Sequence, residues 1–471
     1  MTQQQRAATR LGQHAVVIGA SIGGLLTARV LSDYYAQVTI LDADTPPEQA
    51  VPRKAVPQGS HIHLLLAGGS AVVRKYFPGI HEDLLGAGAR YVDFLADNAN
   101  YMSGRWWPRK PSGINSYVMS RPLLETVVRH HTLALPNVQL RAATRVSGFL
   151  TDTTGKTITG VSLDKDGETI AADLVADVSG RASKTPKWLE QMGYGAPQST
   201  TIGINVGYVT FEAQEPAGRN PDWNFMYAIQ KSIPEDTRGG GLFRVEGGRY
   251  LVTATGYHKD DPPTDWAGFL EFLKSHPHPV LYEEVKNLQP TSDVAAYRYS
   301  AYLRQHYERL RRFPRGLVVL GDAMCSFNPV YGQGMTVAAK EAEYLDECLG
   351  RCASSGAMPD DFALTFFKGA VKFVDAAWNG VTVEDFRYPQ TDGQRPRGFA
   401  LSKWLNAKFF ALSGYDAEFA VAFAKVLNLV DPPASILKFK YLRKALFAKT
   451  PVFRGDPAAL PARAVPEASP P

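Results

Sequence analysis

The chain has 471 residues, 45% of them hydrophobic and 21% charged, which is typical of a globular protein with several domains. Its 51 basic and 46 acidic residues are interleaved and give a net charge of only +5, which argues against a nucleic-acid-binding protein. Three cysteines are too few for a disulfide framework and predict a reducing, cytoplasmic location. We expect no internal repeat, no signal peptide and no transmembrane helix.

The front of the chain predicts a dinucleotide-binding fold. A short apolar strand over residues 14–18 runs into the turn GASIGG, and a buried helix begins at residue 22. The first and third glycines of the dinucleotide fingerprint are Gly19 and Gly24, while the middle position is Ser21. The serine adds only a hydroxymethyl group, and its hydroxyl can donate to a phosphate oxygen at the helix N-terminus.

Asp42 supports this interpretation. It ends the next predicted strand, 23 residues after Gly19, where such folds place an acid on a ribose hydroxyl. A strand-turn-helix without a ligand is the alternative, and this segment alone does not distinguish FAD from NAD.

A second glycine-rich segment, GDAMCSFNPVYGQGM, follows a predicted strand over residues 317–320. Asp322 stands at the carboxyl end of that strand, where it can accept hydrogen bonds from ribityl hydroxyls. Gly332 and Gly334 allow the backbone and the next helix N-terminus to approach an isoalloxazine ring, whose reduced form is negatively charged. The segment therefore predicts a flavin site.

Together, GASIGG with Asp42 and GDAMCSFNPVYGQGM resemble the FAD-dependent aromatic hydroxylase and epoxidase superfamily of single-component flavoprotein monooxygenases. The stretches VPRKAVPQGSHIHLLLAGG, SRPLLE and DVSGRASKTPKWLEQMGY look most like the polyene epoxidases of polyether biosynthesis, which implies secondary metabolism. The resemblance covers residues 14 to about 350. It implies that Arg121 contacts the phosphate region and that Arg53 and Gln58 lie near the flavin. The expected FAD contacts are Gly19, Ser21, Gly24, Asp42, Arg53, Arg121, Asp322, Pro329, Gly332, Gly334 and Met335.

Two positions depart from the family pattern. The second signature, an Asp-Gly pair that serves both FAD and the nicotinamide donor, reads DVSGR and has Ser179 in place of the second acid. We therefore expect weak or indirect NAD(P)H binding, with a flavin reductase as the alternative electron source. Cys325 stands where many aromatic hydroxylases carry histidine, and we expect a small buried residue there.

Residues 197–295 alternate apolar and polar side chains between turn residues, which predicts the antiparallel sheet of a substrate domain. The resemblance implies that this sheet covers the flavin and walls an apolar pocket. The aromatic residues expected to line that pocket are Tyr208, Phe225, Tyr227 and Phe243. A helix over QGSHIHLLLAGGSAVV carries His61 and His63, which are two residues apart and on different faces, so we predict no metal site.

The expected fold is α/β, with a Rossmann-like FAD-binding domain, an antiparallel-sheet substrate domain and a C-terminal helical region. Its parts are a disordered N-terminus over 1–13, the FAD-binding domain over 14–196 and 296–356, the sheet over 197–295, the helices over 357–450 and a disordered tail over 451–471. The basic, amphipathic segment from Ser435 to Lys449 is expected to pack its apolar face on the protein, with membrane-surface contact as the less favoured alternative.

The resulting hypothesis is an FAD-dependent monooxygenase that inserts one oxygen atom from O2 into an apolar small molecule through a C4a-hydroperoxyflavin. Because no general base stands out and alkene epoxidation needs none, the sequence favours epoxidation over hydroxylation, without excluding Baeyer-Villiger oxidation. The alternatives are an oxidase or dehydrogenase, a flavin-binding sensor, and a halogenase, whose Trp-x-Trp-x-Ile motif does not match the adjacent Trp106 and Trp107.

Overall fold

The computed structural model describes residues 10–53, 56–165, 167–230, 232–276, 278–447 and 460–464. Most of the two segments predicted to be disordered, 1–13 and 451–471, lies outside these ranges. Residues 12 and 13 already belong to the first strand.

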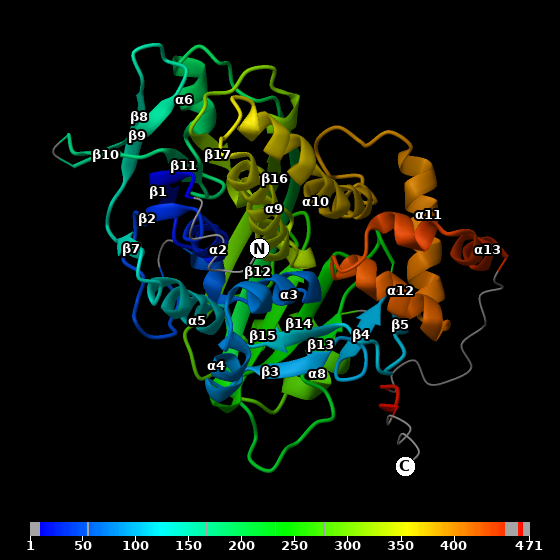
Figure 1. Ribbon diagram of the computed structural model, residues 1–471. Coiled ribbons are helices and arrows are strands. Elements are labelled where there is room, and N and C mark those ends of the chain that lie inside the picture. Colours follow the sequence, from blue (N-terminus) through cyan, green and yellow to red (C-terminus); the bar gives the residue numbers. More distant parts are fainter. Residues whose placement is uncertain are drawn as a thin grey trace, which may run out of the picture.

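A five-stranded parallel sheet has the order β17-β11-β1-β2-β7. Its strands are β1 (Gly12–Ile18), β2 (Tyr35–Leu41), β7 (Val138–Arg141), β11 (Leu174–Asp177) and β17 (Leu317–Val319). The central strands are continuous apolar runs because both of their faces are covered. The helices beside them are α2 (Ile22–Leu31), α5 (Arg121–Leu133) and α9 (Gly334–Ser355), and α2 packs against the other two. Figure 1 shows this sheet at the upper left.

Smaller elements surround this sheet. An antiparallel sheet of β8 (Val146–Thr151), β9 (Ile158–Leu163) and β10 (Thr169–Ala171) packs on β11, and β3 (Arg90–Asp93) pairs with β6 (Asn115–Val118). The short helices of this half are α3 (Ala67–Tyr76), α4 (Ile80–Gly86) and α6 (Thr185–Gln191).

A seven-stranded sheet forms the second layer, with the order β16-β12-β15-β14-β13-β4-β5. Its strands are β4 (Ala99–Met102), β5 (Arg105–Trp106), β12 (Ser199–Gln214), β13 (Phe225–Ala228), β14 (Arg238–Val245), β15 (Arg249–Gly256) and β16 (Ala295–Gln305). The sheet therefore extends beyond the residues 197–295 that the sequence assigned to it. Helices α7 (Trp266–Lys274) and α8 (Val280–Val285) cover one face, where Val209 and Phe211 are buried. Because side chains alternate along a strand, Tyr208 and Thr210 point to the opposite face.

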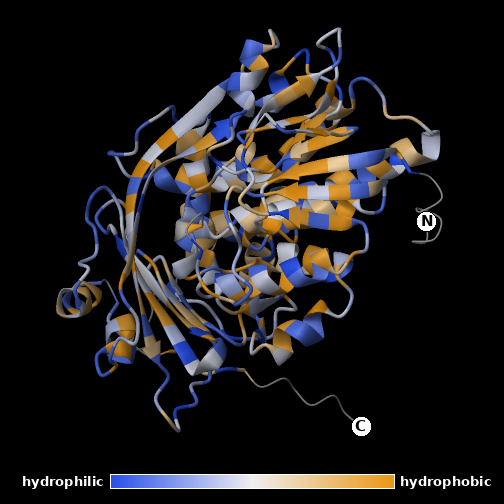
Figure 2. Cartoon of the chain, turned by 90° about the vertical axis from the view of Figure 1, so that its left-hand side faces the viewer, coloured by the Kyte–Doolittle hydropathy of each residue, from blue (hydrophilic) through white to orange (hydrophobic). Residues whose placement is uncertain are grey.

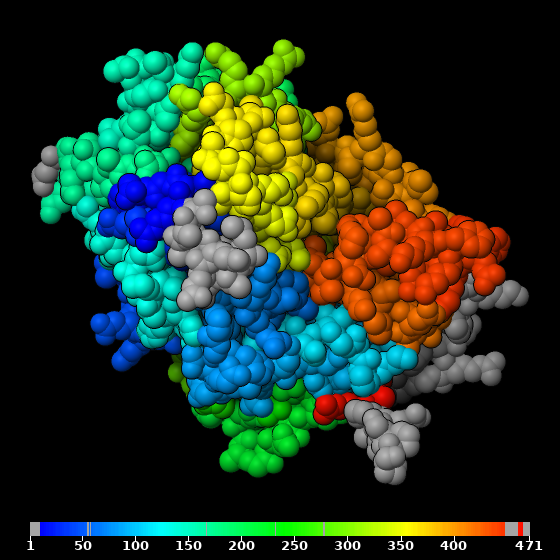
Figure 3. Space-filling view, viewed as in Figure 1, coloured from blue at the N-terminus to red at the C-terminus, as the bar shows by residue number. Residues whose placement is uncertain are grey.

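The C-terminal part is helical, as predicted, and comprises α10 (Phe362–Asp385), α11 (Phe399–Ser413), α12 (Ala417–Leu427) and α13 (Phe439–Phe447). Figure 3 shows these helices in orange and red as one flank of the molecule. They dock on the first half through Asn428, whose carbonyl accepts from the backbone N–H of Gly68 at 3.0 Å. The Asn428 side chain also accepts from the N–H of Ala67 at 3.3 Å, so it satisfies an open donor of α3.

The helix predicted over QGSHIHLLLAGGSAVV is wrong in its first half. A 3-10 turn ends at Ser60, the backbone is then extended, and α3 begins only at Ala67. The physical reason is a competing partner: Leu65 forms a β-bridge with Tyr117, and the hydroxyl of Ser116 donates to the Leu65 carbonyl. His61 and His63 therefore lie on this extended segment.

Hydrophobic residues are concentrated on the inner strands and helices, while hydrophilic residues dominate the outer loops (Figure 2). None of the helices within the described ranges is long and apolar enough to cross a membrane.

Candidate functional site

The turn between β1 and α2 requires glycine at both predicted positions. Gly19 has a φ of +105°, and a Cβ there would collide with the carbonyl oxygen of Val178 in the neighbouring strand turn. A Cβ on Gly24 would collide with the carbonyl oxygen of Gly19. The turn is therefore tight enough for its backbone to approach a phosphate closely.

Asp42 lies beside this turn, at the carboxyl end of β2. Its carboxylate accepts from the backbone N–H of Ala20 at 2.7 Å and from that of Asp44 at 2.9 Å. The guanidinium of Arg53 donates to it at 3.3 Å. Asp42 thus fixes the glycine turn against the second strand, and contact with a ribose stays a prediction.

Arg53 and Arg121 converge on one carboxylate, that of Glu125. The ion-pair distances are 2.7 Å from Arg53 and 2.8 Å from Arg121. Arg121 also donates to the hydroxyl of Ser21 at 2.7 Å, and its other terminal nitrogen lies 3.0 Å from the sulfur of Met335. Arg121, the first residue of α5, therefore connects the glycine turn with the start of α9. Four of the predicted FAD contacts thus lie next to one another: Ser21, Arg53, Arg121 and Met335.

Asp322 follows β17 and stands next to Gly334, the first residue of α9. The Asp322 side chain reaches solvent, although protein atoms surround its carboxyl group. The resulting desolvation raises the pKa of this carboxyl to about 6, while the charges of Arg121 and Arg181 act in the opposite direction. Gly332 has a φ of +64°, whereas Gly334 is helical and a Cβ there would make only ordinary contacts. Glycine is thus required by backbone conformation at the first position and not at the second.

The DVSGR segment is held by its own aspartate. The Asp177 carboxylate accepts from the N–H and hydroxyl of Ser179 at 2.9 and 2.6 Å, and from the hydroxyls of Ser183 and Thr185, both at 2.5 Å. The serine that replaces the second acid is therefore turned inward. Cys325, the other departure, is buried, and burial raises its pKa so that the thiol stays protonated.

A cavity opens between the seven-stranded sheet, the loop before α9 and the C-terminal helices. The volume of this cavity is about 180 Å³. Gln58, Pro329 and Gly332, all predicted to lie near the flavin, are on its wall. Most of the other lining side chains are apolar or aromatic, among them Ile62, Leu64, Leu66, Phe94, Met102, Ile229, Ile233, Val330, Phe410 and Leu427. A mostly apolar pocket beside a glycine-rich loop suits a small apolar ligand.

Comparison with known proteins places the chain in a family. A family model described as "FAD binding domain" matches residues 13–360. Protein Rv3254 of Mycobacterium tuberculosis is 31% identical over 435 residues, which cover 89% of this chain and 90% of that protein. The chain belongs to the FAD binding domain family.

Two solved structures show the same fold. PqsL of Pseudomonas aeruginosa, described as a probable FAD-dependent monooxygenase, matches with a TM-score of 0.60 and 17% identity, over 80% of this chain and 98% of that chain. CmlS, a flavin-dependent halogenase, matches with a TM-score of 0.62 and 12% identity, over 89% and 77%. The architecture is therefore that of FAD-dependent monooxygenases and halogenases, as the α/β prediction expected, while the likeness to polyene epoxidases stays a prediction.

The residues around the strand ends fit FAD. Glycine is obligatory where a phosphate must approach the backbone, and the Nε of Arg121 is buried without a hydrogen-bond partner among the described residues. Asp322 offers an accessible carboxylate for ribityl hydroxyls. The assignment of each contact to one part of FAD stays a prediction.

The four predicted pocket aromatics divide into two groups. Tyr208 and Tyr227 line the cavity. Phe225 and Phe243 stack on each other at 5.1 Å and lie behind Tyr227 and Phe94, which contact them at 5.4 to 5.8 Å. These two phenylalanines are therefore part of the core, because the cavity-facing rings cover them.

His61 and His63 also line the cavity, from the extended segment. Burial lowers the pKa of His61 to about 4, and burial with the charge of Arg121 lowers that of His63 to about 3, so both rings are neutral at pH 7. The Nδ1 of His61 is 2.7 Å from the hydroxyl of Thr210. No group of three or more potential metal ligands occurs within the described ranges.

A carboxyl that the sequence analysis did not single out stands behind this wall. Asp385, the last residue of α10, is fully buried, and the amide of Asn328 donates to its two oxygens at 3.0 and 3.2 Å. The hydroxyl of Tyr331 donates to it at 3.4 Å, and the Asn328 amide also donates to Tyr257 at 3.0 Å. Burial raises the pKa of Asp385 to about 8, although hydrogen bonds from Tyr302, Asn328 and Tyr331 favour the charged form.

Asp385 is thus one tyrosine hydroxyl away from the cavity through Tyr331, which lines it. Tyr257 also lines the cavity but is connected with Asp385 through the Asn328 amide. The sequence held one signal for it: the acid pair Glu384-Asp385 interrupts the apolar run VTVEDF. Acids within a buried apolar helix end are rare unless they are paired or functional.

Proposed function

We propose that this protein is an FAD-dependent monooxygenase that inserts one oxygen atom from O2 into an apolar small molecule. One observation carries the proposal: the mostly apolar cavity shares its wall with Pro329, Gly332 and Gln333, directly before the N-terminus of α9. When bound and reduced, FAD supplies the oxygen chemistry. The chain holds the substrate against this loop and excludes water with side chains from the sheet and from α11 and α12.

The expected preference for epoxidation depended on the lack of a conspicuous base. Asp385 with Tyr331 supplies a group that can hold or move a proton at the cavity wall. The argument against hydroxylation is therefore lost. We propose oxygen transfer to an apolar substrate and make the product class an outcome of the experiment.

The DVSGR segment supports a proposal about the electron source. Because the hydroxyl of Ser179 is bonded to Asp177 at 2.6 Å, it supports the turn and offers no second carboxylate to a nicotinamide donor. We propose that a separate flavin reductase, or NAD(P)H only when substrate is bound, reduces the flavin. Stopped-flow reduction by NADPH without substrate tests this, and fast saturable reduction would contradict it.

Isotope labelling tests the reaction. Candidate polyenes and aromatic compounds are first ranked by the change they cause in flavin absorbance, so that only compounds that reach the site are used. With reductant and 18O2, we expect one labelled oxygen atom in the product by mass spectrometry. Label from H2 18O, a product that has only lost hydrogen, or a halogenated product when halide is present would each contradict the proposal.

A further inference from the structure

The C-terminal helices carry an unusual concentration of exposed apolar side chains. Seven of the ten large hydrophobic residues that are exposed in the described ranges lie between residues 401 and 447. They are Leu401, Trp404, Val430, Leu437, Phe439, Leu446 and Phe447. Phe439 and Phe447 are 80% and 78% exposed. Such a concentration of exposed apolar side chains is typical of an interaction surface, whereas single exposed hydrophobic residues are common on any protein.

Helix α13 has apolar residues on two opposite sides. Tyr441 and Ala445, four residues apart, are buried against the protein. Phe439, Leu446 and Phe447 project from the other side, because successive residues turn by 100° around a helix. Tyr441 and Ala445 thus form the packed apolar face that the sequence predicted, over the part of 435–449 that lies within the described ranges, which end here at residue 447. The exposed side is not the polar surface that a surface helix normally presents.

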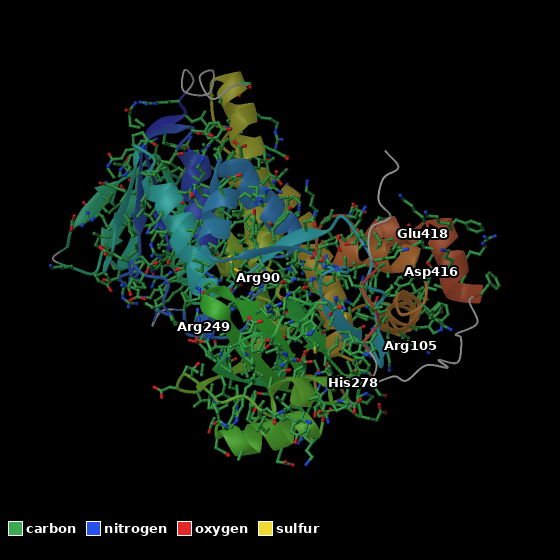
Figure 4. All side chains as sticks on the ribbon, turned by 90° about the horizontal axis from the view of Figure 1, so that it is seen from below. Arg90, Arg105, Arg249, His278, Asp416 and Glu418 are labelled. Carbon is green, nitrogen blue, oxygen red and sulfur yellow. The ribbon has the colours of Figure 1, made fainter. Side chains whose placement is uncertain are left out.

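The same region carries the positive charge of the molecule. Residues 395–447 contain nine Lys and Arg but three Asp and Glu, a net charge of +6, whereas the whole chain has +5. Asp416, which caps α12, and Glu418 in its first turn (Figure 4) pair with Lys444 and Lys440 at 2.7 to 2.9 Å. Within the described ranges, the exposed Lys403, Lys438 and Arg443 have no acidic partner within 4.0 Å.

These helices also adjoin the cavity. Phe410 of α11 and Leu427 and Asn428 at the end of α12 line it, and α11 packs against α13. Figure 1 shows α11 and α13 together at the right edge of the molecule. The exposed face and the cavity wall are therefore two sides of one helical unit.

We propose that this face, formed by α11, α13 and the segment 430–438, docks on the surface of a bilayer that contains anionic lipids. The apolar side chains enter the headgroup region, and the unpaired basic side chains contact lipid phosphates. A second copy of the chain is a poorer occupant, because the residues of this face carry a net charge of +5 and two such faces repel each other. The inference goes beyond the proposed function and does not depend on it.

Vesicle sedimentation with the full-length, flavin-loaded protein tests the proposal. We expect binding to vesicles of phosphatidylcholine with phosphatidylglycerol, and weak binding to phosphatidylcholine alone, with a difference that falls as salt rises. The double variant Phe439→Ala/Phe447→Ala should bind at least about tenfold less tightly. Lys438→Glu/Arg443→Glu should abolish the preference for anionic vesicles.

The matched control is Leu85→Ala/Val294→Ala, which removes exposed apolar side chains elsewhere and should leave vesicle binding unchanged. Unchanged thermal unfolding and flavin content show that each variant is folded. Failure of the wild-type chain to bind anionic vesicles, or equal binding by the Phe439→Ala/Phe447→Ala variant, would overturn the proposal. Self-association that the same substitutions abolish would also overturn it and assign the face to a second copy.

Discussion

The two parts of the candidate site are built in different ways. The glycine turn and Asp42 follow directly on strands of the parallel sheet, and Asp322 comes three residues after the end of β17. The cavity is walled by single side chains from the seven-stranded sheet, several loops and the C-terminal helices. A strand end fixes the place of the residues that follow it, so short motifs specify the first part, whereas the second depends on how distant segments pack.

This difference determines how substitutions affect each part of the site. Substitutions at the strand ends act on backbone conformation or on one charged contact. Substitutions around the cavity act through packing, so a core residue and a pocket residue that are neighbours in sequence have different effects. The following variants test this distinction, from the largest expected effect to the smallest.

Phe243→Ala should lower the free energy of unfolding by about 3 to 5 kcal/mol, because Phe243 is fully buried beneath the cavity wall. Tyr227→Phe, at a ring that faces the cavity, should change stability by about 1 kcal/mol or less and alter ligand binding instead. Thermal and denaturant unfolding measure the first effect, and flavin absorbance with a bound ligand measures the second. A stable Phe243→Ala protein with altered ligand binding would place Phe243 in the pocket after all.

Gly24→Ala should lower the free energy of unfolding by about 3 kcal/mol and reduce the flavin content, because the new Cβ collides with the carbonyl oxygen of Gly19. Gly380→Ala is the matched control, since Gly380 lies inside α10 with nothing within 4 Å of the added Cβ. It should be neutral or stabilising by up to about 1 kcal/mol. Equal losses in both variants would mean that the turn is less tight than the structure shows.

The sequence predicted the parallel sheet and the glycine turn because each motif is continuous in the chain. It did not separate Phe243 from Tyr227, because alternation shows which residues share a face but not where the cavity ends along that face. It extended a helix over His61 because local pattern does not show that Leu65 pairs with Tyr117. The acid at Asp385 interrupts an apolar run in the sequence, but its clustering with Asn328 and Tyr257 arises from three segments, which no local pattern shows.

Asp322→Ala should weaken FAD binding by about ten- to a hundredfold, the loss expected for charged hydrogen bonds worth about 1.5 to 3 kcal/mol. Because Asp322 is solvent-accessible, its removal should leave thermal unfolding of the apoprotein nearly unchanged. Fluorescence titration with FAD gives the dissociation constant. Asp360→Ala, at an exposed ion pair with Arg315, is the control and should bind FAD like the wild-type chain. Unchanged affinity in Asp322→Ala would remove the best-placed carboxylate from the flavin site.

The smallest effect concerns the pH dependence of the cavity half. An ordinary aspartate has a pKa of about 4 in the unfolded chain, whereas burial raises that of Asp385 to about 8 in the folded protein. Between these values the folded state binds a proton that the unfolded state releases, so this group makes stability fall as pH rises through that window. The groups that face the carboxyl are Tyr208, Tyr257, Tyr302, Tyr331, Tyr388, Asn328 and Glu384.

Asp385→Asn removes the titrating proton but keeps an oxygen that can accept from the Asn328 amide. From pH 6 to pH 7, the wild-type chain should lose about 1 kcal/mol more unfolding free energy than this variant. The two proteins should differ least below about pH 4, because the wild-type carboxyl is then protonated in the unfolded as well as the folded state. Urea unfolding at each pH gives the two curves, with Asp360→Asn as the exposed control, which should run parallel to the wild-type chain. Parallel wild-type and Asp385→Asn curves would show that the carboxyl is charged at neutral pH, and the proton-holding role at the cavity wall would then be lost together with the argument that admits hydroxylation.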